Sequence, residues 1–65
     1  MEYKYFTLGT APKVGKDIVV NGRHANVRFV SDKRIFIRRS LILRQPELAI
    51  YKGLAAIRVG FEFIE

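Results

Sequence analysis

The chain has 65 residues, a mass of 7.5 kDa and no cysteine, so it allows one small domain that no disulfide stabilises. Its residues are 49% hydrophobic and 28% charged, too apolar for a disordered tail and too charged for a membrane span. The first residues, 1–6, lack the basic start and apolar core of a secretory signal. We expect a folded domain that is intracellular or assembled from an intracellular pool, is not secreted by a signal peptide and has no membrane partner.

Positive charge is concentrated in the middle of the chain. Lys and Arg number 12 against six Asp and Glu, which gives a formal net charge of +6. Residues 13–44 hold nine of the basic and two of the acidic residues, a net charge of +7, and the remainder carries −1. Such a localised field attracts polyanions such as nucleic acid or an acidic protein, although a solubilising surface has the same composition.

Apolar residues recur at every second position over much of the chain, and Val, Ile, Phe and Tyr dominate them, which is typical of strands. The first strand is predicted over residues 2–8, before a loop that contains Gly and Pro. The strongest turn signal is Asn21-Gly22, because both residues tolerate the positive φ of a type I′ turn. It predicts a hairpin between residues 16–20 and 23–30.

A two-residue loop fixes the pairing of this hairpin, with Val20 opposite Arg23 and Ile18 opposite Ala25. Its apolar face is then formed by Ile18, Val20, Ala25, Val27 and Phe29. Its other face carries Asp17, Val19, His24, Asn26 and Arg28. We expect the first face in the core, and the second face against water or a ligand.

A turn at residues 31–33 leads into a predicted strand over residues 34–39. With a three-residue loop the core side chains of this strand are Ile35 and Ile37, and the outward ones are Arg34, Phe36 and Arg38. A loop of two or four residues would instead pair Phe36 with Phe29 and turn the isoleucines outward. We prefer three residues, because that loop buries two aliphatic side chains and leaves two arginines in water.

Two structures are compatible with the segment after the short apolar run 41–44, which Gln45-Pro46 ends. Pro46 is suited to the first position of a helix. Alternatively, residues 47–51 and 54–64 form a hairpin, which places Glu47 opposite Arg58. We favour the hairpin, because a glycine at position 53 inside a helix costs about 1 kcal/mol relative to alanine. The last strand is the most secure, with alternating Ile57, Val59, Phe61 and Phe63.

These elements predict an all-β fold in one domain over residues 1–65. Six to seven short strands separated by turns indicate a small antiparallel sheet or open barrel, of SH3-like or OB-like architecture. One short helix near residues 46–56 is the remaining option.

The sequence contains little that could perform catalysis. One histidine and no cysteine are too few for a zinc site, and the glycines do not match a phosphate-binding loop. His24 has Asp17 nearby on the predicted sheet, but no nucleophile accompanies them. We therefore expect no enzyme activity, no catalytic residue, no metal, no cofactor and no small-molecule substrate.

The main functional hypothesis is a structural or accessory subunit of a larger, repetitive assembly, for which a virion-like particle is one setting. The predicted C-terminal hairpin is apolar on both faces, so one face needs cover from outside the chain. Its outward residues, which we expect at a protein interface, are Ala49, Tyr51, Leu54 and Ala56. The expected partners are other proteins or further copies of the chain.

The alternative hypothesis is nucleic-acid binding, with phosphates bound by arginines and a base stacked on Phe36. The residues predicted for this face, which would equally suit an acidic protein, are Arg28, Arg34, Phe36 and Arg38, with Arg23, Lys33 and Arg39 at its margins. A third possibility is a small inhibitor that docks on an acidic target protein.

Overall fold

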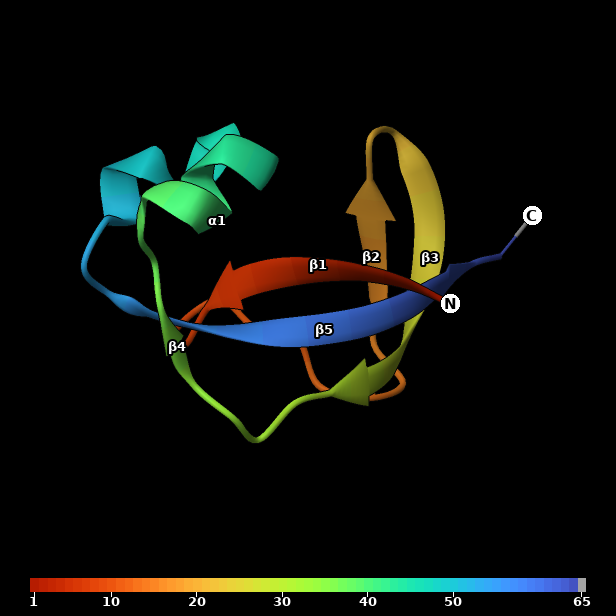
Figure 1. The fold of residues 1–65 in the computed structure, drawn as a ribbon. Coiled ribbons are helices and arrows are strands. Elements are labelled where there is room, and N and C mark those ends of the chain that lie inside the picture. Colours follow the sequence, from red (N-terminus) through yellow and green to blue (C-terminus); the bar gives the residue numbers. More distant parts are fainter. Residues whose placement is uncertain (65) are drawn as a thin grey trace.

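A five-stranded antiparallel sheet, curled into an open half-barrel, forms the centre of the computed structural model, which describes residues 1–64 (Figure 1). The elements in chain order are β1 (Glu2–Thr7), β2 (Asp17–Val20), β3 (Arg23–Val30), β4 (Ile35–Phe36), α1 (Arg39–Arg44), the 3₁₀ helix η1 (Pro46–Tyr51) and β5 (Ala55–Phe63). The strand order is β1-β5-β3-β2, and β4 pairs with the start of β5. The all-β prediction is confirmed, with five strands in place of six or seven.

The β2–β3 hairpin forms as predicted. Asn21 and Gly22 have φ angles of 52° and 77°, as a type I′ turn requires. Val20 pairs with Arg23 and Ile18 with Ala25, and the buried side chains of the hairpin are Val20, Ala25 and Val27. Here the local turn chemistry alone determines the register.

A β-bulge at Arg28 reverses the alternation of β3. Val27 pairs with Phe61 in β5, but Phe29, two residues further on, pairs with the adjacent Gly60. The extra residue turns Phe29 to the face opposite Val27. The prediction that Phe29 shares the core face is therefore wrong, and its ring is partly exposed.

The chain after β3 does not form a third hairpin strand beside it. Strand β3 lies between β5 and β2, so both of its edges are already paired. Strand β4 instead pairs with β5, with Ile35 opposite Ala56 and Phe36 opposite Ala55. The predicted burial of Ile37 is confirmed, whereas Ile35 is exposed.

The 3₁₀ helix η1 occupies residues 47–51, the first arm of the predicted hairpin, so that hairpin is wrong. The apolar run before it forms the short helix α1. Pro46 takes the first position of η1, as the helical alternative proposed. Gly53 has a φ of +89° and lies in the turn after η1, where it does not interrupt a helix. The inner side of the helical segment buries Leu41 and Leu48.

Two small cores lie on opposite faces of β5, because successive strand residues point to opposite faces. The helical-end core, beneath α1 and η1, consists of Ile37, Leu41, Leu48 and Ala56. The sheet-end core, enclosed by the hairpin, consists of Val20, Ala25 and Phe61. Strand β5 contributes to both cores and so connects them.

Candidate interaction surfaces

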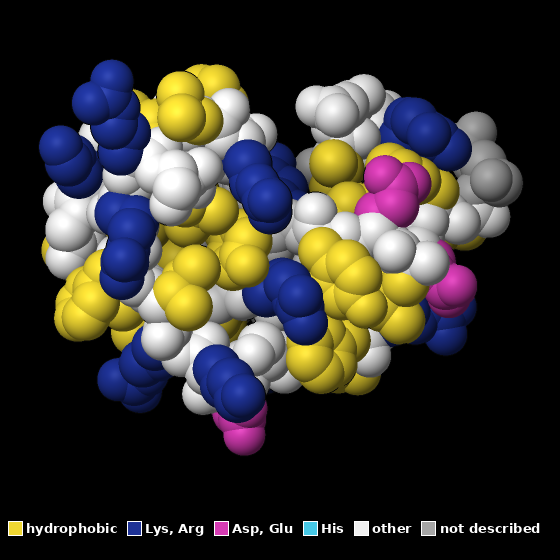
Figure 2. All heavy atoms as spheres, in the orientation of Figure 1, with side chains coloured by type: hydrophobic (Ala, Val, Ile, Leu, Met, Phe, Trp, Pro, Cys, Tyr) yellow, Lys and Arg dark blue, Asp and Glu magenta, His cyan; other side chains and the backbone are white. Residues whose placement is uncertain are grey.

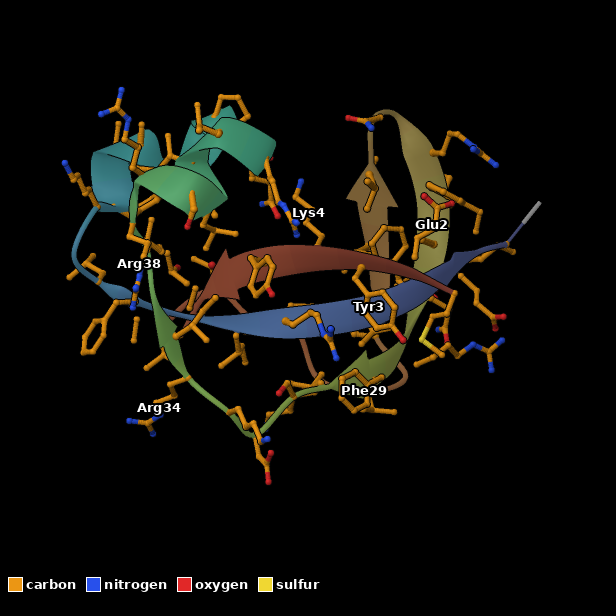
Figure 3. All side chains as sticks on the ribbon, viewed as in Figure 1. Glu2, Tyr3, Lys4, Phe29, Arg34 and Arg38 are labelled. Atoms are coloured by element: carbon orange, nitrogen blue, oxygen red, sulfur yellow. The ribbon has the colours of Figure 1, made fainter. Side chains whose placement is uncertain are left out.

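All seven residues predicted for the nucleic-acid or acidic-partner face are exposed, but they do not form one face. The members are Arg23, Arg28, Lys33, Arg34, Phe36, Arg38 and Arg39. The Arg23 guanidinium stacks on the Phe63 ring at 3.8 Å, and Arg28 pairs with Glu62 at 3.2 Å. Arg34 and Arg38 lie beside β4 and α1, at the other end of the molecule from these contacts (Figure 3). The structure thus divides the predicted site into two groups.

A second aromatic surface lies on β1, β3 and β5, and we call it the platform: Tyr3, Phe29 and Arg58. The Tyr3 and Phe29 rings pack edge to face, with centroids 6.4 Å apart and an interplanar angle of 85°. The Arg58 guanidinium lies 4.6 Å from the Tyr3 centroid and 6.0 Å from that of Phe29. Figure 3 shows both rings on the same side of β5. Tyr3 and Phe29 remain 51% and 39% exposed.

Gly60 lies directly beneath the Tyr3 and Phe29 side chains of the platform. A Cβ at this position would lie 3.0 Å from Tyr3 Cε1 and 3.2 Å from Phe29 Cβ, and it would also meet the Met1 sulfur. Only a residue without a side chain lets these groups approach the strand so closely. The other residues of β5 are all apolar or charged. A glycine within such a strand was the sequence signal for this surface.

Sequence reasoning missed the platform for two reasons. The bulge at Arg28, which carries Phe29 to this face, has no turn residue to mark it. Tyr3 and Arg58 are neighbours only because β1 pairs with β5, at the far end of the chain. That pairing could not be derived from local patterns.

A cleft of about 560 Å³ borders the platform, between β1, the end of β2 and the junction of α1 with η1. Tyr3, Arg58 and Arg44 are among its lining residues. Two other lining residues are joined by hydrogen bonds: Gln45 Oε1 accepts one from Tyr5 N at 2.8 Å, and Gln45 Nε2 donates one to Tyr5 O at 2.9 Å. The amide of Gln45 therefore satisfies part of the outer edge of β1 in place of another strand.

The charges around the cleft leave the two arginines without acidic partners. Glu47 is paired with Lys4 at 3.4 Å, and Glu62 with Arg28. Within residues 1–64, no carboxylate lies at ion-pair distance from Arg44 or Arg58. A hydrogen bond from its own backbone N–H, assisted by the Lys4 ammonium, holds the pKa of Glu47 below its ordinary value.

Three of the four residues predicted for a protein interface are exposed. Ala49, Tyr51 and Leu54 are exposed, although they belong to η1 and the turn after it instead of a hairpin. Ala56 is 0% exposed, because it lies in the helical-end core beneath the helices, so that prediction is wrong. Two further apolar residues, Leu43 and Ile50, are more exposed than Tyr51 and Leu54.

Metal sites, membrane spans and relatives offer no further guide. Residues 1–64 bring together no set of three or more His, Cys, Asp or Glu side chains suited to a metal ion. In the same part of the chain, no helix has the length and hydropathy to cross a bilayer. Comparison with protein-family models, curated proteins and solved structures finds no match. The surfaces themselves are the basis for assigning a function.

Proposed function

We propose that the chain is a non-catalytic protein-interaction subunit of a larger, repetitive assembly, such as a virion-like particle, and that it docks by its helical end. The observation that supports this is the exposure of Leu43 and Ile50, at 76% and 81%. Each lies two residues after a leucine of the helical-end core, so α1 and η1 each have an apolar outer side as well as an apolar inner side. The outer side needs a partner for burial.

The excess of exposed apolar side chains extends beyond these two residues. Among residues 1–64, thirteen large hydrophobic side chains are exposed, against nine hydrophobic residues that are buried. A domain this small has too little interior to bury both sides of its helices. In Figure 2, hydrophobic side chains reach the surface over the helical end, interspersed with Lys and Arg. Covering one such side chain contributes about 1.5–3 kcal/mol.

The charge around the helical end favours an acidic partner. Arg38 and Arg39 lie at the start of α1 and Lys52 follows η1, and no ion pair within residues 1–64 involves them. Identical copies, each with a net charge of +6, repel one another at low salt. A protein with an apolar pocket and an acidic rim is attracted instead. Self-association becomes favourable only when salt screens the repulsion.

Light scattering of the nuclease-treated chain tests this proposal. In about 1 M salt the Debye length falls to about 3 Å, so apolar contacts dominate. The molar mass is expected to rise above the 7.5 kDa of the monomer as the concentration increases. The double variant Leu43→Ser/Ile50→Ser should remain monomeric under the same conditions.

Val14→Ser is the matched control, because Val14 is 64% exposed but belongs to the β1–β2 loop. It should associate as the natural chain does. A natural chain that stays monomeric at every concentration in high salt would contradict the proposal. So would a control variant that loses association as completely as the double variant.

A further inference from the structure

The platform contains aromatic surface that the fold itself does not require. Neither Tyr3 nor Phe29 belongs to the helical-end core or the sheet-end core. Both rings are nevertheless held in place, by their mutual edge contact and by the absence of a side chain at Gly60. Because the rings are nearly perpendicular, a flat ligand that stacks on one ring meets the edge of the other. This is a preformed stacking site.

The charge beside these rings is positive and available. Arg58 stacks on the Tyr3 ring, and Arg44 lines the adjoining cleft. Within residues 1–64, neither guanidinium has a carboxylate partner. The cleft carboxylate Glu47 is already neutralised by Lys4. Glu2 is the other carboxylate in the cleft lining, against two available arginines. A ligand with flat rings joined by anionic groups fits this combination.

We propose that the platform binds single-stranded nucleic acid. A base stacks on one of the two rings and meets the edge of the other, and neighbouring phosphates are bound by Arg58 and by Arg44 along the cleft. A duplex does not present unstacked base faces, so it lacks the stacking contribution. This site is separate from the outer side of the helical end, and the inference does not depend on the proposed docking function.

Fluorescence anisotropy tests the proposal with labelled single-stranded DNA and RNA of about ten nucleotides, at low salt. The variant Tyr3→Leu/Phe29→Leu keeps an apolar side chain at both positions but removes both π faces. It should bind about tenfold more weakly or worse. The oligonucleotide bound more tightly by the natural chain identifies whether DNA or RNA is the preferred ligand.

Phe36→Leu is the matched control, because Phe36 is an aromatic residue that is more exposed than Tyr3 or Phe29 and also has arginines near it in the sequence. Its binding should equal that of the natural chain. Leu43→Ser/Ile50→Ser should also bind normally, which separates this site from the docking surface. If Phe36→Leu weakens binding as much as the platform variant, the platform is not the site.

A second variant keeps the test valid if the platform double variant does not fold. Arg44→Gln/Arg58→Gln removes two phosphate contacts, so the slope of log affinity against log salt should decrease by about 1.4. An unchanged slope would overturn the assignment of these arginines. Absence of binding by the natural chain, equal affinity for duplex, or equally effective competition by polyglutamate would overturn the proposal as a whole.

Discussion

The two cores on either face of β5 are built by different means. The sheet-end core lies within a hairpin whose turn, register and facing are specified by consecutive residues, from Asp17 to Val27. The helical-end core joins Ile37, two short helical turns and Ala56, which no local pairing brings together. Its geometry depends on side-chain packing, and its outer side remains apolar and exposed. The difference indicates that the hairpin stabilises the fold and that the helical end is the part suited to a partner.

The first way to test this contrast is Ile37→Ala, in the helical-end core, where Ile37 is 1% exposed. We expect the free energy of unfolding to fall by about 2–5 kcal/mol, because the cavity cannot close fully in so small a core. Urea unfolding followed by circular dichroism measures it. Since β5 belongs to both cores, hydrogen exchange at Ala25 and Val27 should accelerate as well. Unchanged protection there would mean that the two ends unfold independently.

The second test removes the contact between the helical segment and β1. Gln45→Leu deletes two hydrogen bonds to the backbone of Tyr5, at a position that is only partly exposed. The free energy of unfolding is expected to fall by about 1–3 kcal/mol, because the N–H and C=O groups of Tyr5 then lack their hydrogen-bond partner. Arg44→Gln, at the adjacent residue, is the control and should change the unfolding midpoint little. Equal effects of the two variants would assign the loss to the helix itself.

The third test acts on the sheet end. Gly22 has a φ of +77°, so Gly22→Ala should cost about 1–2 kcal/mol. Gly9→Ala is the matched control, since Gly9 has no positive φ and a Cβ there would meet no atom within 4 Å. It should be neutral or slightly stabilising. Thermal unfolding midpoints distinguish the two, and equal midpoints would show that the turn is not strained by a side chain.

The same contrast explains what could be predicted from the sequence. The hairpin was predictable to the residue, because Asn21-Gly22 fixes a turn type and the turn type fixes the pairing. The long last strand was predictable from its alternation. In the helical segment, by contrast, the apolar runs are too short to distinguish period two from a helical period. Gly53 does not count against a helix here, because it follows the end of η1.

The interaction surfaces were less predictable than the fold. Most of the predicted interface residues are exposed, because apolar residues in excess of what a small core can bury must reach the surface. The platform could not be derived, since it combines a bulge at Arg28 with the pairing of the first and last strands. Gly60 was the one local hint that another group approaches β5 closely.

The smallest expected effect concerns Glu47, which links η1 to β1 through Lys4. Its pKa is lowered, so its contribution to stability is present above the unfolded-state value of 4.5 and is lost as the pH falls through the lower folded-state value. Because the pair is partly exposed, Glu47→Gln should cost less than about 1 kcal/mol at neutral pH. The difference from the natural chain in urea unfolding should shrink as the pH falls below 4.5, and it should vanish once Glu47 is protonated in the folded state, where both chains carry a neutral side chain. A difference that persisted in acid would mean that the side chain stabilises η1 through packing, and that charge contributes nothing to holding the helical end against β1.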